Sequence, residues 1–165
     1  MVQNVAVYRG SFLINLNVKC EEMITNYKSS AIERCYEGNF SLTPQRLMVL
    51  EAVSEQEKPI SAYDLRAKIK KIGADLNIAT IYRILDFWCN LSLVHRISAI
   101  NKFVRCTAPE EKHIHVINCC QKCEDLVETC NEAMGLDLER GTAQLGLSLT
   151  TNGHIEIPVI CSRCG

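Results

Sequence analysis

Two pairs of cysteines constrain this chain more than any other feature of its sequence. Each pair is a Cys-x-x-Cys motif, Cys120 with Cys123 and Cys161 with Cys164, and residues 124–160 lie between them. Four thiolates in two such pairs form a closed tetrahedral zinc site, which is structural because it leaves no position open for a substrate. The spacing exceeds that of a compact zinc ribbon. We therefore expect the metal to tie the end of a domain back to its beginning.

The cysteine content also bears on the compartment. The chain has 10 cysteines in 165 residues, which in a secreted protein would indicate disulfides. Residues 1–20 lack the basic start and cleavage site of a signal peptide, and no stretch is apolar enough to span a membrane. We expect a cytoplasmic protein with no membrane partner, and residues 1–20 have no assigned role. The unpaired cysteines that fit no ligand pattern are interpreted as buried or incidental thiols: Cys20, Cys35, Cys89, Cys119 and Cys130.

Charge divides the chain into two parts. Residues 1–109 contain 14 Lys and Arg against 10 Asp and Glu, whereas residues 110–165 contain 4 against 9. A basic part followed by an acidic part indicates two modules with different partners.

Local signals in the first part predict helices followed by a β-hairpin. Thr43, Ser61 and Asn77 are expected helix caps, with Pro44 at a first helical position where its missing N–H is tolerated. Residues 61–64 are expected to form a capping box, in which the Ser61 and Asp64 side chains satisfy backbone amides at the start of the helix. The expected helices cover 21–36, 44 onward, 62–73 and 78–89, and the expected strands cover 93–97 and 102–106. This order is that of a winged helix-turn-helix, which places its recognition helix in a DNA major groove.

The helix over 78–89 is the expected recognition helix. Its buried stripe is predicted to be Ile78, Ile81, Leu85 and Trp88, which leaves Thr80 and Arg83 on the opposite face. An exposed Arg there can grip a guanine edge. The predicted DNA contacts are Tyr63, Thr80, Tyr82 and Arg83 at bases or phosphates, and Arg46 and Lys70 at phosphates, with Arg66, Lys68, Lys71 and Lys102 as further phosphate candidates.

The second part is expected to be a small α/β unit. Strands are predicted over 113–119 and 125–130, and a helix over 132–145 despite two glycines. The segments 147–151 and 154–160 alternate in polarity around Asn152-Gly153, a strong hairpin signal. A unit of this size has little core of its own, which favours reinforcement by a metal. The predicted domains are 21–107 and 108–165, and the fold class is α/β (α+β).

Four motifs in this order resemble the ferric uptake regulator family, and most closely its zinc uptake branch. They are LTPQRLMVL, ISAYDL, ATIYRILDF and LVHRI, followed by the paired cysteines. The resemblance runs from about Ser41 to Cys164. It implies a winged-helix domain, a C-terminal dimerisation domain and metal-dependent binding of a homodimer to double-stranded operator DNA. It also implies repression of zinc uptake genes. One departure is Glu124, where the family commonly has Gly.

The resemblance further implies a regulatory zinc site between the two domains. Its ligands in the zinc uptake branch match His95, Cys106, His113 and Glu128. One thiolate, two imidazoles and a carboxylate suit zinc, whereas iron-sensing sites favour nitrogen and oxygen alone. With the four-cysteine site, this gives one structural and one regulatory zinc per chain. His115 and His154 are interpreted as surface residues, with an additional metal site as the alternative.

Two other functions remain open at this point. An iron- or peroxide-responsive regulator of the same family is one, and the thiolate of Cys106 argues against it. A zinc-dependent hydrolase is the other, but it needs an open metal position and a general base, and no catalytic motif supports it. We therefore expect no enzyme and no small-molecule substrate.

Overall fold

The structure, a computed structural model, describes residues 16–109, 114–130, 134–149 and 153–165. These residues divide into two compact units, 16–109 and 114–165, which are described separately below. No helix within the described ranges combines the length and apolarity needed to cross a membrane.

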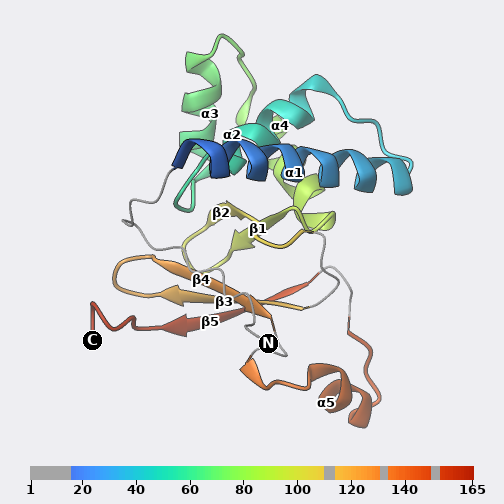
Figure 1. Cartoon of the computed structure of the whole chain (residues 1–165), viewed down its shortest axis with the longest axis vertical. Coiled ribbons are helices and arrows are strands. Elements are labelled where there is room, and N and C mark those ends of the chain that lie inside the picture. Colours follow the sequence, from blue (N-terminus) through green and yellow to red (C-terminus); the bar gives the residue numbers. More distant parts are fainter. Residues whose placement is uncertain (1–15, 110–113, 131–133, 150–152) are drawn as a thin grey trace. The chain divides into compact units, whose positions relative to one another are not determined.

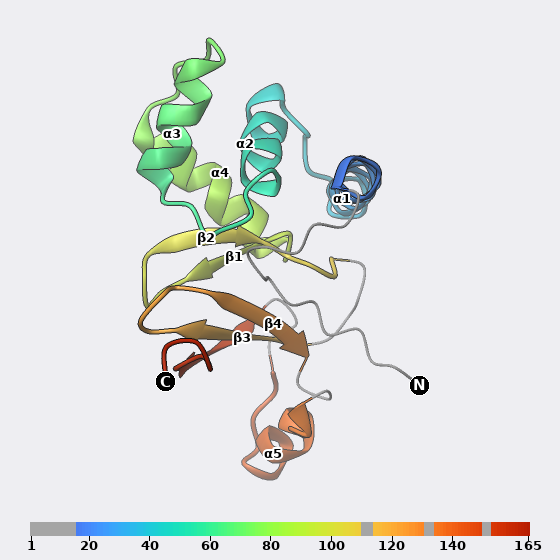
Figure 2. The same cartoon turned by 60° about the vertical axis from the view of Figure 1, so that its left-hand side comes forward.

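The first unit has the predicted order of elements. Its helices and strands are α1 (Leu16–Glu37), α2 (Pro44–Ser54), α3 (Ala62–Lys71), α4 (Ile78–Asn90), β1 (Val94–Ile97) and β2 (Lys102–Arg105). β1 and β2 pair antiparallel, with His95 opposite Val104. α2 packs against α1, α3 and α4, and Figure 2 shows α2 between α1 and α3. The unit is a winged helix-turn-helix preceded by α1. This α1 begins at Leu16, before the predicted residue 21, because no Gly or Pro interrupts the intervening residues.

The predicted helix caps are confirmed. The Thr43 hydroxyl accepts a hydrogen bond from the Arg46 amide at 3.3 Å, and the Ser61 hydroxyl accepts one from the Asp64 amide at 3.1 Å. The Asn77 side-chain oxygen accepts one from the Thr80 amide at 2.8 Å. Each cap satisfies an amide that has no partner within its helix, which fixes where the helix begins.

The core of this unit confirms most of the predicted stripe. Ile81, Leu85 and Trp88 are fully buried, Ile84 joins them, and Ile78 is only half-buried. The Trp88 indole N–H donates to the Arg46 carbonyl oxygen at 2.9 Å, so the largest buried side chain also ties α4 to α2.

Asn77 offers a direct test of the start of the recognition helix. Asn77→Ala is expected to lower the free energy of unfolding by about 1 kcal/mol, because the Thr80 amide loses its acceptor. Asn77→Asp keeps an acceptor at the same position and is expected to retain most of the stability. Urea unfolding of the three proteins measures the difference, and equal midpoints for Ala and wild type would contradict the capping role.

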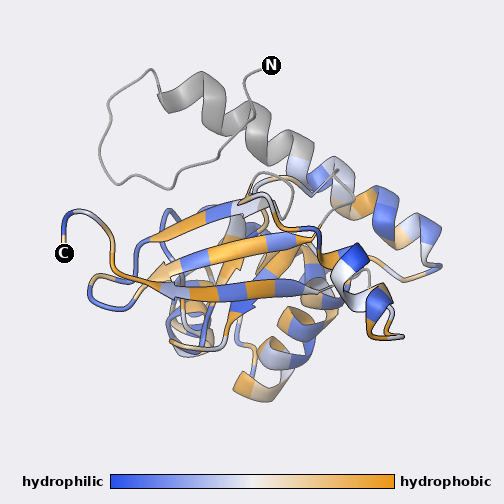
Figure 3. Ribbon diagram, turned by 90° about the horizontal axis from the view of Figure 1, so that it is seen from below, coloured by the Kyte–Doolittle hydropathy of each residue, from blue (hydrophilic) through white to orange (hydrophobic). Residues whose placement is uncertain are grey.

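The second unit is a three-stranded sheet with one short helix. Its elements are β3 (His115–Cys120), β4 (Leu126–Cys130), α5 (Leu138–Gln144) and β5 (His154–Val159), and the strand order is β4-β3-β5 (Figure 1). β3 pairs antiparallel with β4 and parallel with β5. Hydrophobic and hydrophilic residues both occur along these strands (Figure 3); in β5 they alternate, with Ile155, Ile157 and Val159 after His154, Glu156 and Pro158, which gives that strand two chemically different faces.

Two predictions for this unit were wrong. Residues 147–149 form no strand, and β5 pairs with β3 instead of closing a hairpin at Asn152-Gly153, of which residue 152 lies outside the described residues. β3 is central and buried, so both its edges need partners; β4 pairs with one edge and β5 with the other.

The predicted helix over 132–145 is also shorter in the structure. Gly135 has a φ of 70°, a left-handed conformation that a helix cannot include, and α5 begins only at Leu138 with Asp137 as its cap.

Candidate metal centres and nucleic-acid interface

The four paired cysteines meet at one end of the second unit. Cys120 ends β3, Cys123 lies in the turn after it, and Cys161 and Cys164 follow β5, which lies beside β3. Their Sγ atoms all lie within 4.8 Å of one another, and those of Cys123 and Cys161 are 3.7 Å apart. Around a tetrahedral zinc with Zn–S bonds of about 2.3 Å, sulfurs are about 3.8 Å apart. The cluster therefore fits a zinc ion.

Backbone amides prepare this cluster for a cation. The Cys161 amide donates to the Cys120 sulfur at 3.4 Å. This bond, followed by those from the amides of Cys123 and Lys122, lowers the pKa of the Cys120 thiol to about 6. Hydrogen bonding to Cys120 raises the pKa of Cys123 to about 12. Without metal, a thiolate at Cys120 is thus stabilised beside the Cys123 thiol, whose proton a bound zinc would replace.

The turn after the first cysteine pair has a left-handed backbone conformation at Glu124. Glu124 has a φ of 58° and its amide donates to the Cys120 carbonyl oxygen at 2.9 Å. Glycine adopts this left-handed conformation without steric strain, which is why Gly suits the position. Glu124 takes the same conformation, so the turn is kept with a less favourable residue.

The β1–β2 hairpin is the wing of the first unit. Two predicted regulatory ligands lie at its root, the end at which its two strands join the rest of the unit. His95 is the second residue of β1, and Cys106 directly follows β2, where its amide donates to the Leu93 carbonyl oxygen at 2.9 Å. A ring nitrogen of His95 and the Sγ of Cys106 lie within 4.8 Å of each other, and both residues are buried. The hairpin thus presents an imidazole and a thiol together, as two ligands of one metal require.

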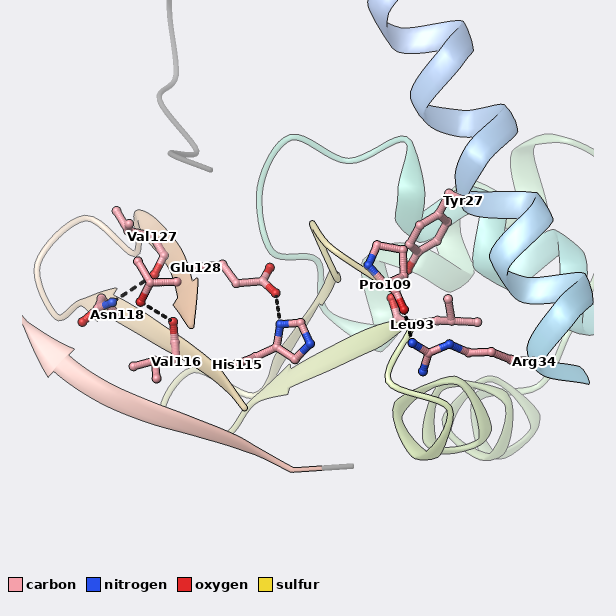
Figure 4. Close-up of polar contacts among 10 residues, drawn as sticks. Tyr27, Arg34, Leu93, Pro109, His115, Val116, Asn118, Val127 and Glu128 are labelled. Atoms are coloured by element: carbon pink, nitrogen blue, oxygen red, sulfur yellow. Dashed lines mark hydrogen bonds and ion pairs between the residues drawn. The ribbon is translucent and has the colours of Figure 1, made fainter. Parts of the chain in front are cut away.

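Two further candidate ligands lie together in the second unit. The Nδ1 atom of His115 is 2.7 Å from the Oε1 atom of Glu128 (Figure 4). Because Ile117 is opposite Glu128 in the β3–β4 register, His115 and Glu128 share one face of the sheet. His115 is only 4% exposed, so its interpretation as a surface residue was wrong. His113 lies outside the described residues. Because side chains alternate along a strand, His115 lies on the same face as Ile117, two residues away. This spacing could have indicated that His115 is buried.

His154 lies next to this pair in the register. It is opposite His115 across the parallel β3–β5 ladder, and its Nε2 atom is 3.4 Å from Glu156 Oε1. Its side chain is 20% exposed, so His154 is intermediate between the predicted surface position and a buried ligand.

The exposed face of α4 carries the predicted DNA reader. Arg83 is exposed, on the side of α4 opposite the buried Ile81 and Leu85. On α3, Tyr63 is 66% exposed and Lys70 is exposed. Long donor side chains free to extend from a recognition helix are what base-edge recognition in a major groove requires.

Two other predicted DNA contacts, Tyr82 and Arg46, have side-chain partners within the first unit. Tyr82 is half-buried, and its ring meets Phe103 of β2 edge to face, with the ring centroids 6.1 Å apart. Thr80 is half-buried at the start of α4. The Arg46 guanidinium lies over the Phe87 ring at 3.6 Å and donates to the Ser41 carbonyl oxygen at 2.5 Å. These contacts hold Arg46 in place, which lowers the entropy it would lose on binding a phosphate.

Comparison with known proteins is consistent with this arrangement. The zinc uptake regulation protein of Escherichia coli is 33% identical over 131 residues, which cover 79% of this chain and 76% of that protein. The ferric uptake regulation protein of Bacillus subtilis is 27% identical, over 64% of this chain and 77% of its own length.

Solved structures give the same picture. One described as a zinc uptake regulator complexed with zinc and DNA matches with a TM-score of 0.70 and 30% identity, covering 88% of this chain and 94% of its own. The crystal structure of holo XcZur matches with a TM-score of 0.66 and 28% identity, covering 86% and 97%. The ferric uptake regulator family model matches residues 37–157. With its winged helix, paired-cysteine cluster and this match over most of its length, the chain belongs to the ferric uptake regulator family.

Proposed function

We propose that this chain is a zinc-responsive transcriptional repressor that binds operator DNA as a zinc-loaded homodimer in the cytoplasm and represses zinc uptake genes. The observation that carries the proposal is the buried His95–Cys106 pair at the root of the wing, because it places metal ligands inside the DNA-binding unit itself. The similarity to the zinc uptake regulation protein of Escherichia coli and to a zinc uptake regulator complexed with zinc and DNA supports the same function. The proposed domains are the DNA-binding residues 21–107 and the dimerisation residues 108–165.

The proposed regulatory site joins two pairs of ligands. His95 and Cys106 come from the first unit, and Glu128 and a histidine come from the second. We assign that histidine to His115, in place of the predicted His113, because His115 is the one that lies 2.7 Å from Glu128. One nitrogen–sulfur pair and one nitrogen–oxygen pair complete a tetrahedral set that suits zinc.

Zinc at this site would act by shifting a population of conformations. A metal bound to ligands from both units favours those arrangements of the units in which all the ligands reach it. In a dimer this would favour a spacing of the two α4 helices that fits successive major grooves. Protein without regulatory zinc would sample other arrangements and bind DNA weakly.

The chemistry of the ligands favours zinc over iron as the sensed metal. The Cys106 thiolate is a soft ligand that suits zinc, whereas iron-sensing sites use nitrogen and oxygen ligands. The family to which the chain belongs consists of transcription regulators, not enzymes, and this sets aside the hydrolase. With the four-cysteine site, the proposed content is two zinc ions per chain.

A gel-shift experiment tests the proposed function. The purified protein is titrated onto promoters of zinc importer genes at buffered free zinc concentrations, with iron(II) and manganese(II) as competing metals. We expect zinc alone to produce the high-affinity complex, with two zinc ions per chain by metal analysis. Equal retardation with and without zinc, or a stronger response to iron, would refute the proposal.

Arg83 and Lys70 are expected to act differently on DNA. Arg83→Ala should lose roughly 1–3 kcal/mol per half-site and relax the preference at one base pair, because a base-edge contact is removed. Lys70→Ala should weaken binding to all sequences alike and reduce its salt dependence. Arg140, which is exposed on α5, provides the control: Arg140→Ala removes the same charge from the second unit. Unchanged affinity and base preference for Arg83→Ala would assign base reading to another residue.

A further inference from the structure

Two side chains of α1 contact the backbone around the wing. The Tyr27 hydroxyl donates to the Leu93 carbonyl oxygen, and the Arg34 guanidinium donates to the carbonyl oxygens of Leu91 and Pro109. Figure 4 shows both side chains reaching from α1 toward this backbone. Tyr27 is 6% exposed and belongs to the core of the first unit, so its hydroxyl is brought to Leu93 by a packed ring.

The three acceptors mark the two ends of the wing. Leu91 is the C-cap of α4, where the last carbonyls of a helix lack partners within it. Leu93 immediately precedes β1, and Pro109 follows β2. A single guanidinium therefore connects the end of the recognition helix with the chain that leaves the wing. His95 and Cys106 both lie between these two points.

The Leu93 carbonyl connects Tyr27 to one ligand directly. It accepts a hydrogen bond from Tyr27 and another from the Cys106 amide, which is 2.9 Å away. The position of the Cys106 sulfur thus depends on a carbonyl that α1 holds in place. Metal ligands bind more tightly when hydrogen bonds from surrounding residues already hold them in position, because less entropy is lost when the metal binds.

We propose that Tyr27 and Arg34 are positioning residues for the regulatory site. Through them α1 holds the root of the wing, so that metal binding by His95 and Cys106 is coupled to the position of the recognition helix. The inference rests on the proposed function. In this arrangement α1 sets the free zinc concentration at which the repressor responds, without contributing a ligand. Removing the contacts raises that concentration and leaves the four-cysteine site unaffected.

Three variants and a matched control test this role. Arg34→Gln removes the cation that reaches both carbonyls, Arg34→Lys keeps the charge but not the two-pronged geometry, and Tyr27→Phe removes only the hydroxyl and keeps the ring in the core. Lys28→Gln is the control, because Lys28 pairs with Glu51 of α2 at 2.5 Å. It therefore loosens α1 from the helices but not from the wing.

The first measurement needs no regulatory metal. Hydrogen exchange of the Cys106 amide is followed in protein whose four-cysteine site alone is loaded. We expect Tyr27→Phe and Arg34→Gln to accelerate this exchange on the order of tenfold, because the amide's acceptor is no longer held, and Lys28→Gln to leave it unchanged. Arg34→Lys should fall between wild type and Arg34→Gln. If Arg34→Gln does not fold, Tyr27→Phe still decides the question.

The second measurement is a cobalt(II) titration, in which the thiolate-to-cobalt absorption band reports metal binding by Cys106. Tyr27→Phe and Arg34→Gln should need on the order of tenfold more free cobalt to develop that band, with DNA binding restored at saturating metal. His95→Ala separates the two proposals. If His95→Ala loses the cobalt band while Tyr27→Phe and Arg34→Gln bind cobalt like wild type, the positioning role alone is overturned. If His95→Ala keeps the cobalt band, the proposed ligand set is overturned. If Lys28→Gln lowers the cobalt affinity as much as Tyr27→Phe and Arg34→Gln do, the effect is general destabilisation and the positioning role is overturned.

Discussion

Cys120→Ser is expected to release the tightly bound zinc and unfold most of residues 114–165, and with them the dimer. At structural zinc sites the free energy of metal binding, roughly 10–16 kcal/mol, is also folding free energy. The second unit has few other sources of stability, since α5 contributes no buried residue and β5 is at most half-buried. Zinc content by mass spectrometry, mass by light scattering and near-UV circular dichroism measure the three losses.

The neighbouring cysteine on β3 provides the matched control. Cys119 is also buried, but adjacent residues on a strand point to opposite faces, and its sulfur is not in the four-cysteine cluster. Cys119→Ser should therefore keep the zinc and the dimer. Cys161→Ser should reproduce the loss seen with Cys120→Ser. A folded Cys120→Ser dimer with undiminished zinc would show that the cluster is not the structural site.

Cys106→Ser should produce the opposite pattern. The four-cysteine site stays filled and the dimer stays intact, but zinc no longer stimulates operator binding. Serine does not supply the soft thiolate that makes the site selective for zinc. Without that stimulation the affinity should fall to that of non-specific binding, on the order of 10³-fold or more weaker. Zinc titrations that follow metal content and DNA retardation together measure both sites in one experiment.

Variants of the remaining ligands identify the histidine in the regulatory site. His95→Ala should behave like Cys106→Ser, and Glu128→Ala should be milder because water can replace a carboxylate oxygen. His115→Ala should abolish the zinc response and His113→Ala should keep it. The reverse result would assign the ligand to His113. Cys89→Ser, a change at a cysteine outside both sites, controls for the loss of a thiol. Wild-type zinc dependence in Cys106→Ser would place the sensing site elsewhere.

The winged helix could be predicted from sequence because its signals are local. Thr43, Ser61 and Asn77 define helix starts through bonds to amides three residues away, and the apolar spacing of Ile81, Leu85 and Trp88 specifies a buried face. These signals lie within a few residues of one another, so they can be recognised without knowledge of tertiary contacts.

The second unit was predicted less well because its structure depends on distant partners. The Asn152-Gly153 signal favours a hairpin, but β3 needed a second neighbour and β5 supplies it. His115 looks like a surface residue in isolation, but in the structure it is buried beside Glu128 of the neighbouring strand. The contacts of Tyr27 and Arg34 with backbone carbonyls have no sequence pattern, because a carbonyl is present at every residue.

The parallel pairing of β5 with β3 also bears on the order in which the chain folds. The β1–β2 pair and the helix caps of the first unit join residues close in sequence, so forming these features costs little loop-closure entropy. β5 reaches β3 only after residues 121–153 have been looped back, and longer closures are entropically more costly and slower. We therefore expect the winged helix to form early and the sheet late. Zinc binding at the four cysteines then stabilises the sheet once β5 has paired with β3. During that interval the free edge of β3 is exposed, and newly made protein is most prone to aggregation when zinc is scarce.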